Sequence, residues 1–536
     1  MKTDYISFED SGYFTKIILD YLTENSDLES FYSLYPNLYN FEHAIANKNF
    51  TLESRRILVE SLKGQYKKDG IKLGNDGSVL TNLNSLEAGT TYTVTTGHQL
   101  CLFTGPLYFI YKIVSTIKLC QNLKSRYPEC DFVPVYWMAT EDHDFEEVNH
   151  FYTGDRKFHW ETEQKGAVGR MKLAELKPTV EAFGSWLTDY STNAEELKSL
   201  FEKAYLKHDT LAAATRYLVH ELFSDHGVVI VDGDDSKLKE LFKPTIKKEL
   251  LEEFSAQAVE LQSKEFAEKY KIQVNPREIN LFYLTDNSRE RIVKENGTFA
   301  VNGTSISFSE EEILLELENH PERFSPNVLL RPVYQDTILP NLAYIGGGGE
   351  LAYWFQLKTT FEQAETPMPI LILRNSAVWL NENQTKVFRQ LNISNEQLFL
   401  SEGVLMKEWV KANSAIDLEL VGQKQTQVEF YKALEKLAGS VDSSLEKHVK
   451  ALATKQLKAI DQLSEKLIRA ERRKATTAQQ RISFLKDTLF YNNGLQERSL
   501  NFSEIYLFQG KGMIGDLIHS FTTPAEDFLI LQSEQQ

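Results

Sequence analysis

The sequence predicts an α/β protein whose parallel-sheet core is interrupted by two insertions and followed by an α-helical coiled-coil domain. Residues 91–96 and 132–138 are short β-branched or apolar runs typical of buried strands, and residues 107–119 between them have helical apolar spacing. Strand, loop, helix and strand in this order form a βαβ unit, whose crossover we expect to be right-handed. Between Pro369 and Pro524 there is no proline, and apolar residues recur there in steps of three and four, which is coiled-coil spacing.

The composition is that of a large folded protein. The chain has 536 residues, of which 42% are hydrophobic, so it can bury a large core in more than one domain. The formal net charge of −17 argues against non-specific binding to nucleic acid and against binding to anionic membranes. No apolar run approaches the roughly 20 residues of a membrane helix. An anionic small molecule stays compatible with this charge, because it needs only a local positive site.

Cysteine usage and the first residues favour a cytoplasmic protein. Cys101, Cys120 and Cys130 are too few and too scattered for a disulfide framework or a zinc site, and they suit a reducing cytosol. Residues 1–10 contain no basic region followed by an apolar core, so we expect no secretory signal.

The remaining segments complete the predicted domain order. The first 90 residues have amphipathic helical patterns, with a turn at residues 75–77, and further strands are expected at 227–232 and 369–374. Hairpin chemistry around residues 272–274, 281–284 and 299–303 indicates a β-rich insertion. The expected divisions are 1–151 for the N-terminal helices and the first half of the core, 152–205 for the first insertion, 206–270 for core, 271–308 for the β-rich second insertion, 309–385 for core, 386–490 for the coiled coil, and 491–536 for a return to the core.

The coiled-coil segment is expected to be a helical hairpin rather than one rod. Gly439 and Ser440 suggest a turn, and Ser443 with Glu446 has the spacing of a capping box. The second arm, about 45 residues, would be roughly 65 Å long. We expect so long a helix to pair with its hairpin partner or with another subunit.

The densest chemistry follows the strand at 132–138, where Glu141, Asp142, His143 and Asp144 are consecutive. Such a cluster can hold a substrate amine, can supply a general base from His143 and a carboxylate together, or can bind a divalent metal. The alternative without a ligand is a charged helix N-terminus, where acidic residues are favourable.

A second candidate is the loop after the first strand, which begins Gly97-His98-Gln99. A glycine there lets the backbone approach a phosphate, and His98 could donate a hydrogen bond to the charge on a transferring phosphate. The alternative is a helix-entry loop in which the histidine caps the turn. Cys101 in the same loop is a conceivable nucleophile, but no base partner is visible.

A third candidate comprises Arg331 and the glycine run 346–349 before Glu350. Arginine offers a bidentate fork for a carboxylate or phosphate, and the glycine amides could form an anion nest at the start of a helix. A flexible loop with a structural arginine explains the same residues. Arg374 and Asn375 end a strand in a similar way, although a buried arginine can also cap backbone carbonyls. Gly494, shortly before Glu497 and Arg498, signals a turn that returns the chain to the core.

These motifs resemble a known family. Thr-Gly-His-Gln with Leu-Phe-Thr-Gly-Pro-Leu-Tyr, Val-Pro-Val-Tyr-Trp with Glu-Asp-His-Asp-Phe, Leu-Leu-Arg-Pro-Val-Tyr-Gln, Gly-Glu-Leu-Ala-Tyr-Trp and Leu-Gln-Glu-Arg are similar, in this order, to motifs of the BshC cysteine ligases of bacillithiol biosynthesis. They run from about residue 95 to 500. One departure concerns the glycine run, because the family pattern Gly-Gly-Pro-Gly-Glu is here Gly347-Gly348-Gly349-Glu350, and a loop without the proline is looser.

The resemblance implies a Rossmann-like core with two connecting insertions, a coiled coil that joins two subunits in a homodimer, and a ligase that joins cysteine to glucosaminyl malate in the last step of bacillithiol biosynthesis. It also implies an adenine nucleotide, ATP or ADP, and no metal at the acidic cluster. By a distant likeness to class I synthetases, Gly97-His98-Gln99 would stand where those proteins have a nucleotide-binding histidine motif.

The resemblance and the residue chemistry together predict the site. The expected catalytic residues are His98, Glu141, Asp142, His143 and Asp144. The expected substrate- and nucleotide-binding residues are Gly97, Gln99, Thr104, Gly105, Arg331, Gln335, Gly348, Gly349, Glu350, Tyr353, Trp354, Arg374, Asn375, Glu497 and Arg498. Within this set, Arg331 and Arg374 are expected to hold the malate carboxylates.

Two other functions remain open from the sequence. One is a metal-dependent hydrolase or deacetylase that uses the cluster from Glu141 to Asp144. The other is a coiled-coil scaffold whose core has lost activity. The first requires stoichiometric metal, and the second predicts tolerance of substitutions in the cluster.

Overall fold

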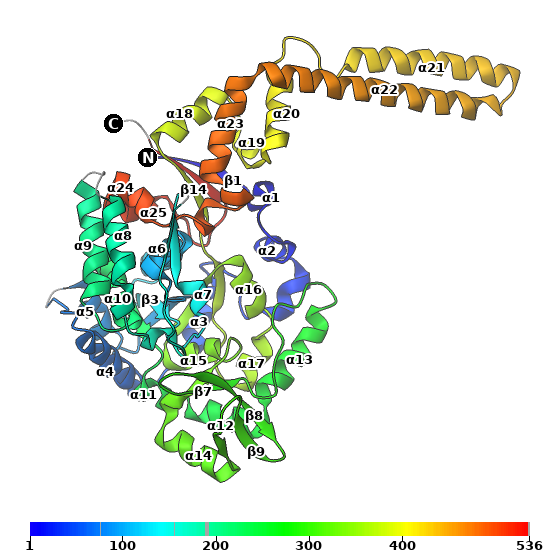
Figure 1. Ribbon diagram of the computed structural model, residues 1–536. Coiled ribbons are helices and arrows are strands. Elements are labelled where there is room, and N and C mark those ends of the chain that lie inside the picture. Colours follow the sequence, from blue (N-terminus) through cyan, green and yellow to red (C-terminus); the bar gives the residue numbers. More distant parts are fainter. Residues whose placement is uncertain (75–76, 155, 188–191, 534–536) are drawn as a thin grey trace. The chain divides into compact units, whose positions relative to one another are not determined.

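The computed structural model describes residues 1–74, 77–154, 156–187 and 192–533, and the turn predicted at 75–77 lies largely outside these ranges. The chain divides into two compact units (Figure 1). The larger unit comprises residues 7–377 and 497–529, and the smaller comprises residues 1–6, 378–496 and the segment from 530 onward.

The larger unit is built on a five-stranded sheet in which every neighbouring pair is parallel. Its strands are β2 (Thr91–His98), β3 (Asp131–Met138), β6 (Val229–Asp232), β12 (Asn341–Gly346) and β13 (Ile370–Leu373), in the spatial order β13-β12-β2-β3-β6. Read from β6, these are the third, second, first, fourth and fifth strands of the sheet along the chain, which is Rossmann order. The strand order therefore reverses between β2 and β12, where such folds bind ligands.

The predicted βαβ unit is confirmed. Helix α6 (Tyr108–Arg126) connects β2 to β3 and is buried along most of its first half, because apolar residues occupy nearly every position there. The two strands pair in register from Thr91 with Asp131 to His98 with Met138. Their carboxyl ends therefore lie level, and the residues that follow them can share one site.

The N-terminal region is mostly helical, as predicted, with α2 (Lys16–Leu22), α3 (Asn40–Asn47), α4 (Leu52–Lys68) and α5 (Ser78–Ser85). One part of the prediction is wrong, since the chain begins with a strand, β1 (Lys2–Ile6). This strand pairs with β15, which lies more than 500 residues later, so no local pattern announces it.

The segment after β3 forms a small sheet and two helices. Strands β4 (His150–Thr153) and β5 (Arg156–His159) pair antiparallel, and α8 (Lys177–Trp186) and α9 (Thr192–Leu206) follow. Phe183 of α8 packs edge-on against the aromatic rings of both β strands and of α9. An aromatic cluster thus forms the core of this insertion.

The second insertion is β-rich, as predicted. Its sheet has the order β10-β9-β8-β7-β11, formed by β7 (Leu281–Leu284), β8 (Arg289–Glu295), β9 (Thr298–Val301), β10 (Ser307–Phe308) and β11 (Phe324–Pro326). Residues 272–274, expected to be extended in a hairpin, form no strand, and β11 lies beyond the predicted range. Both β7 and β8 carry side chains that line the candidate functional site.

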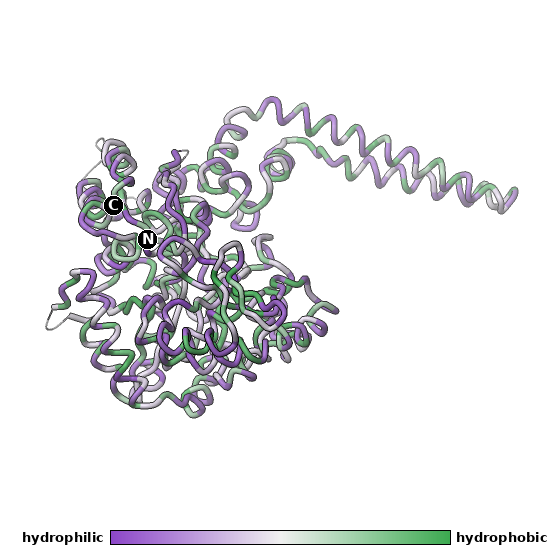
Figure 2. The backbone as a smooth tube through the Cα atoms, turned by 60° about the horizontal axis from the view of Figure 1, so that its bottom comes forward, coloured by the Kyte–Doolittle hydropathy of each residue, from purple (hydrophilic) through white to green (hydrophobic). Residues whose placement is uncertain are grey.

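The smaller unit contains α18 (Glu382–Leu391), α20 (Glu402–Asn413) and a helical hairpin of α21 (Val421–Val441) and α22 (Leu445–Lys474), which lie side by side (Figure 1). The hairpin prediction is confirmed. Hydrophilic and hydrophobic segments alternate along both arms (Figure 2). None of the helices in the described ranges combines the length and the apolar character needed to cross a membrane.

Three details of the hairpin differ from the prediction. The chain turns at residues 442–444, because α21 continues through Gly439. The residue that caps α22 is Ser444, without a side-chain cap hydrogen bond, and not Ser443 of the predicted box with Glu446. The Glu446 side chain from the second arm lies over Gly439, where a Cβ would require that flexible side chain to move. The second arm is not one helix but α22, 30 residues long, and α23 (Thr476–Leu489), 14 residues long, separated at Ala475.

Candidate functional site

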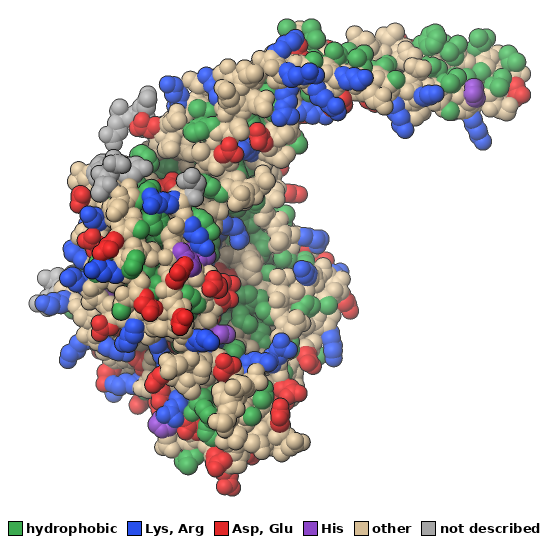
Figure 3. Space-filling model, in the orientation of Figure 1, with side chains coloured by type: hydrophobic (Ala, Val, Ile, Leu, Met, Phe, Trp, Pro, Cys, Tyr) green, Lys and Arg blue, Asp and Glu red, His purple; other side chains and the backbone are tan. Residues whose placement is uncertain are grey.

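A cavity of about 450 Å³ opens in the larger unit at the carboxyl ends of β2, β3 and β12. That volume is in the usual range of small-molecule sites, roughly 300–1,000 Å³. The strand ends supply Gly97, His98, Glu141 and Asp142, and the second insertion supplies Phe282 and Arg289. Figure 3 shows a hollow on this face of the larger unit, with apolar side chains inside it and charged ones around it. The predicted convergence of strand ends on one cavity is therefore present.

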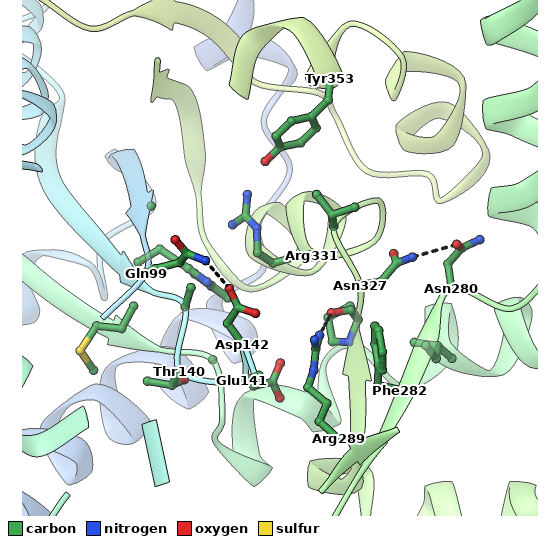
Figure 4. Close-up of a pocket in the computed structure, with 18 of the residues that line it drawn as sticks. Gln99, Thr140, Glu141, Asp142, Asn280, Phe282, Arg289, Asn327, Arg331 and Tyr353 are labelled. Atoms are coloured by element: carbon green, nitrogen blue, oxygen red, sulfur yellow. Dashed lines mark hydrogen bonds between the residues drawn. The ribbon is translucent and has the colours of Figure 1, made fainter. Parts of the chain in front are cut away.

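Asp142 is one of the two carboxylates of the acidic cluster that line this cavity, the other being Glu141. Its Oδ2 accepts a hydrogen bond from Nε2 of Gln99 at 2.7 Å (Figure 4). Its Oδ1 accepts one from the backbone N–H of His143 at 2.7 Å. Within the described ranges no lysine or arginine forms an ion pair with its side chain, and Nδ1 of His143 lies 3.9 Å from its Oδ1. Asp142 is thus a half-buried anion that can still bind a cationic ligand group.

Glu141 is already paired. Its Oε1 lies 2.6 Å from Nζ of Lys239, whose side chain is fully buried, and its Oε2 accepts from Ser325 Oγ at 3.2 Å. Burial raises the pKa of Glu141, and the Lys239 ammonium opposes that shift. The predicted role of Glu141 in acid–base catalysis therefore competes with a buried ion pair.

His143 and Asp144 do not line the cavity. Nη1 of Arg289 lies 3.0 Å from Nδ1 of His143, and a guanidinium can only donate, so this nitrogen is the acceptor. Burial and the neighbouring Arg289 lower the pKa of His143. Asp144 is exposed at the start of the short helix α7 (Phe145–Val148). The expected joint action of these two as base and carboxylate is not the arrangement found.

The same geometry bears on a metal site. A metal at the cluster would need Glu141, His143 and a further carboxylate to converge, but Lys239 and Arg289 occupy the first two. Among the described residues, no three His, Cys, Asp or Glu side chains are grouped to hold a metal ion.

His98 is a neutral imidazole in this cavity. Burial lowers its pKa to about 4, and the nearby Lys112 ammonium contributes to the shift. Nδ1 lies 2.8 Å from the backbone oxygen of Gln99, which can only accept, so Nδ1 carries the proton. Nε2 is then an acceptor, which reverses the predicted role of His98 as a donor to phosphate charge.

Arg331 enters the cavity from α15 (Arg331–Ile338) through a box of aromatic rings. Its guanidinium lies 5.8–6.0 Å from the ring centroids of Trp137, Tyr344 and Trp354, and its Nη1 donates to Gln335 at 3.0 Å. The phenol of Tyr353, another residue of the cavity lining, points toward the guanidinium (Figure 4). In the part of the chain that the structure describes, no carboxylate forms an ion pair with it. Arg331 is therefore a rigidly held cation facing the cavity.

Gly97 leaves space that neighbouring side chains of the cavity occupy. A Cβ there would lie 3.3 Å from Tyr344 Oη and 3.7 Å from Arg331 Nη1. The missing side chain leaves room for the arginine and its aromatic box.

The predicted anion nest at the glycine run is filled by the protein itself. The Glu350 carboxylate accepts the N–H of Gly347 at 2.8 Å at the start of α16 (Gly348–Trp354), and Lys112 pairs with it at 2.5 Å. Burial would raise the pKa of Glu350, but Lys112 and the Gly347 N–H hold it below its ordinary value. An external phosphate would have to displace an ionised carboxylate, so the prediction that the glycine amides bind an anionic ligand is wrong.

The structure separates the other predicted residues from the cavity. Arg374 and Glu497 form a buried ion pair of 2.6 Å. Gln335 and Trp354 are fully buried behind Arg331. The remaining predicted residues outside the cavity lining are Thr104, Gly105, Gly348, Gly349, Asn375 and Arg498. Gly105 has φ +64° and a close approach to Cys101, which explains a glycine there. Burial raises the pKa of the Cys101 thiol to about 12, so it is a poor nucleophile.

Sequence reasoning missed several residues of the site. Lys112 lies in the apolar run of α6, and Lys239 lies in α11 (Ser236–Glu240); both are buried beneath the cavity. A lysine in an otherwise apolar helix was the available signal for Lys112. Arg289, Asn280 and Asn327, which line the cavity, had no comparable signal.

Two family models match almost the whole chain. The model of the N-terminal Rossmann-like domain of bacillithiol biosynthesis BshC matches residues 1–375, and that of the C-terminal coiled-coil domain matches residues 377–533. The chain belongs to the BshC family. The resemblance and the Rossmann-like fold class predicted from the sequence are thereby confirmed.

Relatives in this family are similar over their full length. A protein of Flavobacterium psychrophilum is 48% identical over 99% of this chain and 100% of its own. Proteins of Flavobacterium johnsoniae and Christiangramia forsetii are 47% and 46% identical over 99% of this chain, and over 100% and 99% of their own. All three are named "Putative cysteine ligase BshC".

Proposed function

We propose that this protein is a cysteine ligase that joins the carboxyl group of cysteine to the amine of glucosaminyl malate, with activation by ATP, in the last step of bacillithiol biosynthesis. Family membership and the names of its relatives support the reaction class. One structural observation carries the proposal further. Among the described residues Asp142 has no lysine or arginine partner and Arg331 has no carboxylate partner, and both face one cavity at the reversal of strand order. A ligand with an ammonium and an anionic group fits that pair.

In this proposal Asp142 holds the glucosamine ammonium, and Gln99 fixes the carboxylate that does so. The amine must lose a proton before it attacks the activated carboxyl group. The Nε2 lone pair of His98 is the acceptor, and phosphate charge bound close by would raise the pKa of His98 toward neutrality. Arg331 holds a malate carboxylate in a bidentate fork.

ATP supplies the activation of the cysteine carboxylate. The glycine run is a poor phosphate cradle, because Glu350 already occupies it. The loop after β2 also uses backbone amides internally, at Phe103, Gly105 and Leu107. Arginine side chains that line the cavity, Arg277 and Arg291 among them, are better suited to hold the phosphates.

The decisive experiment incubates the purified protein with cysteine, glucosaminyl malate and ATP, and follows the thiol product, AMP and ADP by mass spectrometry. Asp142→Asn and His98→Ala should each abolish product while the circular dichroism spectrum is unchanged. The matched control is Asp131→Asn, an exposed acid at the opposite end of the same strand, which should keep full activity. Normal turnover by both site variants would refute these assignments, and AMP or ADP would distinguish an adenylate from an acyl phosphate.

We also propose a homodimer through the hairpin of α21 and α22. Phe430, Leu437 and Val441 of α21 are 55%, 64% and 77% exposed. Large apolar side chains aligned on one helix favour association with another surface, and a second copy of the same hairpin supplies one.

A further inference from the structure

A chain of buried polar contacts runs from α11 to the wall of the cavity. Nζ of Lys239 contacts Glu141 Oε1 at 2.6 Å and the backbone oxygen of Phe324 at 2.7 Å. Ser325 Oγ donates to Glu141 Oε2 at 3.2 Å, and Nε of Arg289 donates to Ser325 Oγ at 3.0 Å. The chain thus joins the end of β3 to β11 and β8 of the second insertion.

The guanidinium at the end of this chain is held by neutral groups and lines the cavity. Besides Ser325, Nη2 of Arg289 donates to the Pro326 carbonyl at 3.0 Å, and Nη1 donates to His143. The ring of Phe282 lies beneath it, 4.0 Å from the guanidinium carbon. No carboxylate of the described residues is within ion-pair distance. Since an arginine has five N–H donors, two stay available to a ligand.

We propose that Arg289 is a carboxylate receptor, and that Glu141 positions it through Ser325 rather than acting in the chemistry. Together with Arg331, which lies across the cavity (Figure 4), it makes a site for a ligand with two carboxylates. This rests on the proposed function, in which the malyl part of the amine substrate carries both carboxylates. The sequence predicts Arg331 and Arg374 as the two arginines that hold the malate carboxylates. In this proposal Arg289 of the second insertion takes the role predicted for Arg374.

The role of Glu141 follows from the direction of its hydrogen bonds. The Lys239 ammonium favours an ionised Glu141, so the Ser325 hydroxyl must donate toward the carboxylate. Its oxygen lone pairs then face Arg289 and accept the Nε–H. A neutral residue at 141 would let the hydroxyl turn, and the guanidinium would lose the contact that fixes its plane. Glu141 is therefore a positioning residue.

Binding measured by calorimetry on the full-length protein tests this without requiring turnover. Two amines serve as probes: glucosaminyl malate, and methyl glucosaminide, which has the same amine but no carboxylate. Arg289→Gln should weaken binding of glucosaminyl malate roughly ten- to hundredfold, as expected for loss of a charge-assisted contact, and leave methyl glucosaminide unchanged. Arg289→Lys, which keeps the charge without the fork, should give an intermediate loss.

The positioning chain has its own variants. Ser325→Ala should weaken the binding of glucosaminyl malate several-fold and raise its KM with little change in kcat. Ser325→Thr, which restores the hydroxyl, should restore the affinity. The matched control is Ser61→Ala, a buried serine that accepts one hydrogen bond from Gln65 on α4, and it should alter neither constant. Equal losses for both probes would make Arg289 merely structural, and unchanged affinity in Arg289→Gln would overturn the receptor.

The two proposals fail separately. If wild-type protein makes product and Arg289→Gln binds glucosaminyl malate normally, only the receptor is wrong. If wild-type protein makes no product but binds L-malate in a manner that depends on Arg289, the receptor stands and the ligase assignment fails.

Discussion

The ion pair between Arg374 and Glu497 offers a sharp test, because the sequence predicts both residues as ligand-binding whereas the structure buries their charged groups against each other. Their side chains are 5% and 1% exposed, and Nη2 of Arg374 lies 2.6 Å from Glu497 Oε1. Glu497 also accepts from Ser376 Oγ at 3.3 Å and from the backbone N–H of Ala377 at 3.1 Å. One carboxylate thus satisfies three donors next to the last strand of the sheet.

Replacing Glu497 by Gln removes the charge at nearly constant volume. The Arg374 cation then stays buried without a counter-ion, and the new amide group faces donors with its own N–H. Breaking a buried pair by removing one partner costs roughly 3–5 kcal/mol. Glutamine keeps one acceptor oxygen, so we expect a loss at the lower end, about 3 kcal/mol, in the free energy of unfolding of the larger unit.

Urea unfolding followed by circular dichroism measures the loss, and the KM values for ATP and glucosaminyl malate are measured on the same variant at low temperature. The control is Glu87→Gln, which breaks an exposed pair with Lys63 at 3.5 Å and should cost less than about 1 kcal/mol. The structural assignment is refuted if Glu497→Gln unfolds within about 1 kcal/mol of wild type while a KM rises tenfold.

Three further predictions concern the imidazole, the glycine and the hairpin. The pKa of His98 is about 4 in the folded protein, against roughly 6.5 in an unfolded chain. The unfolded state therefore binds more protons between these values, and the free energy of unfolding falls as pH drops from 6.5 toward 4. His98→Asn should flatten that decline in urea unfolding measured at pH 7 and pH 5, and an unaltered pH dependence would contradict this prediction. Gly97→Ala should raise KM several-fold by crowding the Tyr344 hydroxyl beside Arg331, without changing the unfolding midpoint of the smaller unit. An unchanged KM would show that the Tyr344 ring moves aside. Leu437→Glu should convert a dimer into a monomer in light scattering, and a wild-type monomer would sink the homodimer proposal.

Local sequence patterns were sufficient to predict four strands of the core sheet. The strands β2, β3, β6 and β13 are apolar runs bounded by polar residues, and each falls where the sequence predicts it. Strand β1 was missed because its residues are mostly exposed or half-buried, so it carries no buried-strand pattern. The break at Ala475 has a visible sequence correlate, since the apolar seam of the coiled coil weakens at Lys474.

The location of the site was predictable for a physical reason. Parallel strands end at one edge of the sheet, so polar residues that follow β2 and β3 must meet there. The roles of these residues were less predictable, because partners distant in sequence decide them. Lys239 lies 98 residues from Glu141, and Arg289 lies 146 residues from His143. No spacing rule relates those positions.

The acidic cluster illustrates why four adjacent ionisable residues cannot all serve one ligand. The chain turns at Thr140 and Glu141 immediately after β3, so successive side chains diverge. Glu141 is paired with a buried lysine, His143 contacts an arginine and Asp144 is exposed, which leaves Asp142 as the carboxylate available to a ligand in the cavity. The same criterion selects Arg331 and Arg289 over Arg374, since only the latter has a carboxylate partner within the described fold. A strand end shows where a ligand binds, and the charges that the fold leaves uncompensated show which residues bind it.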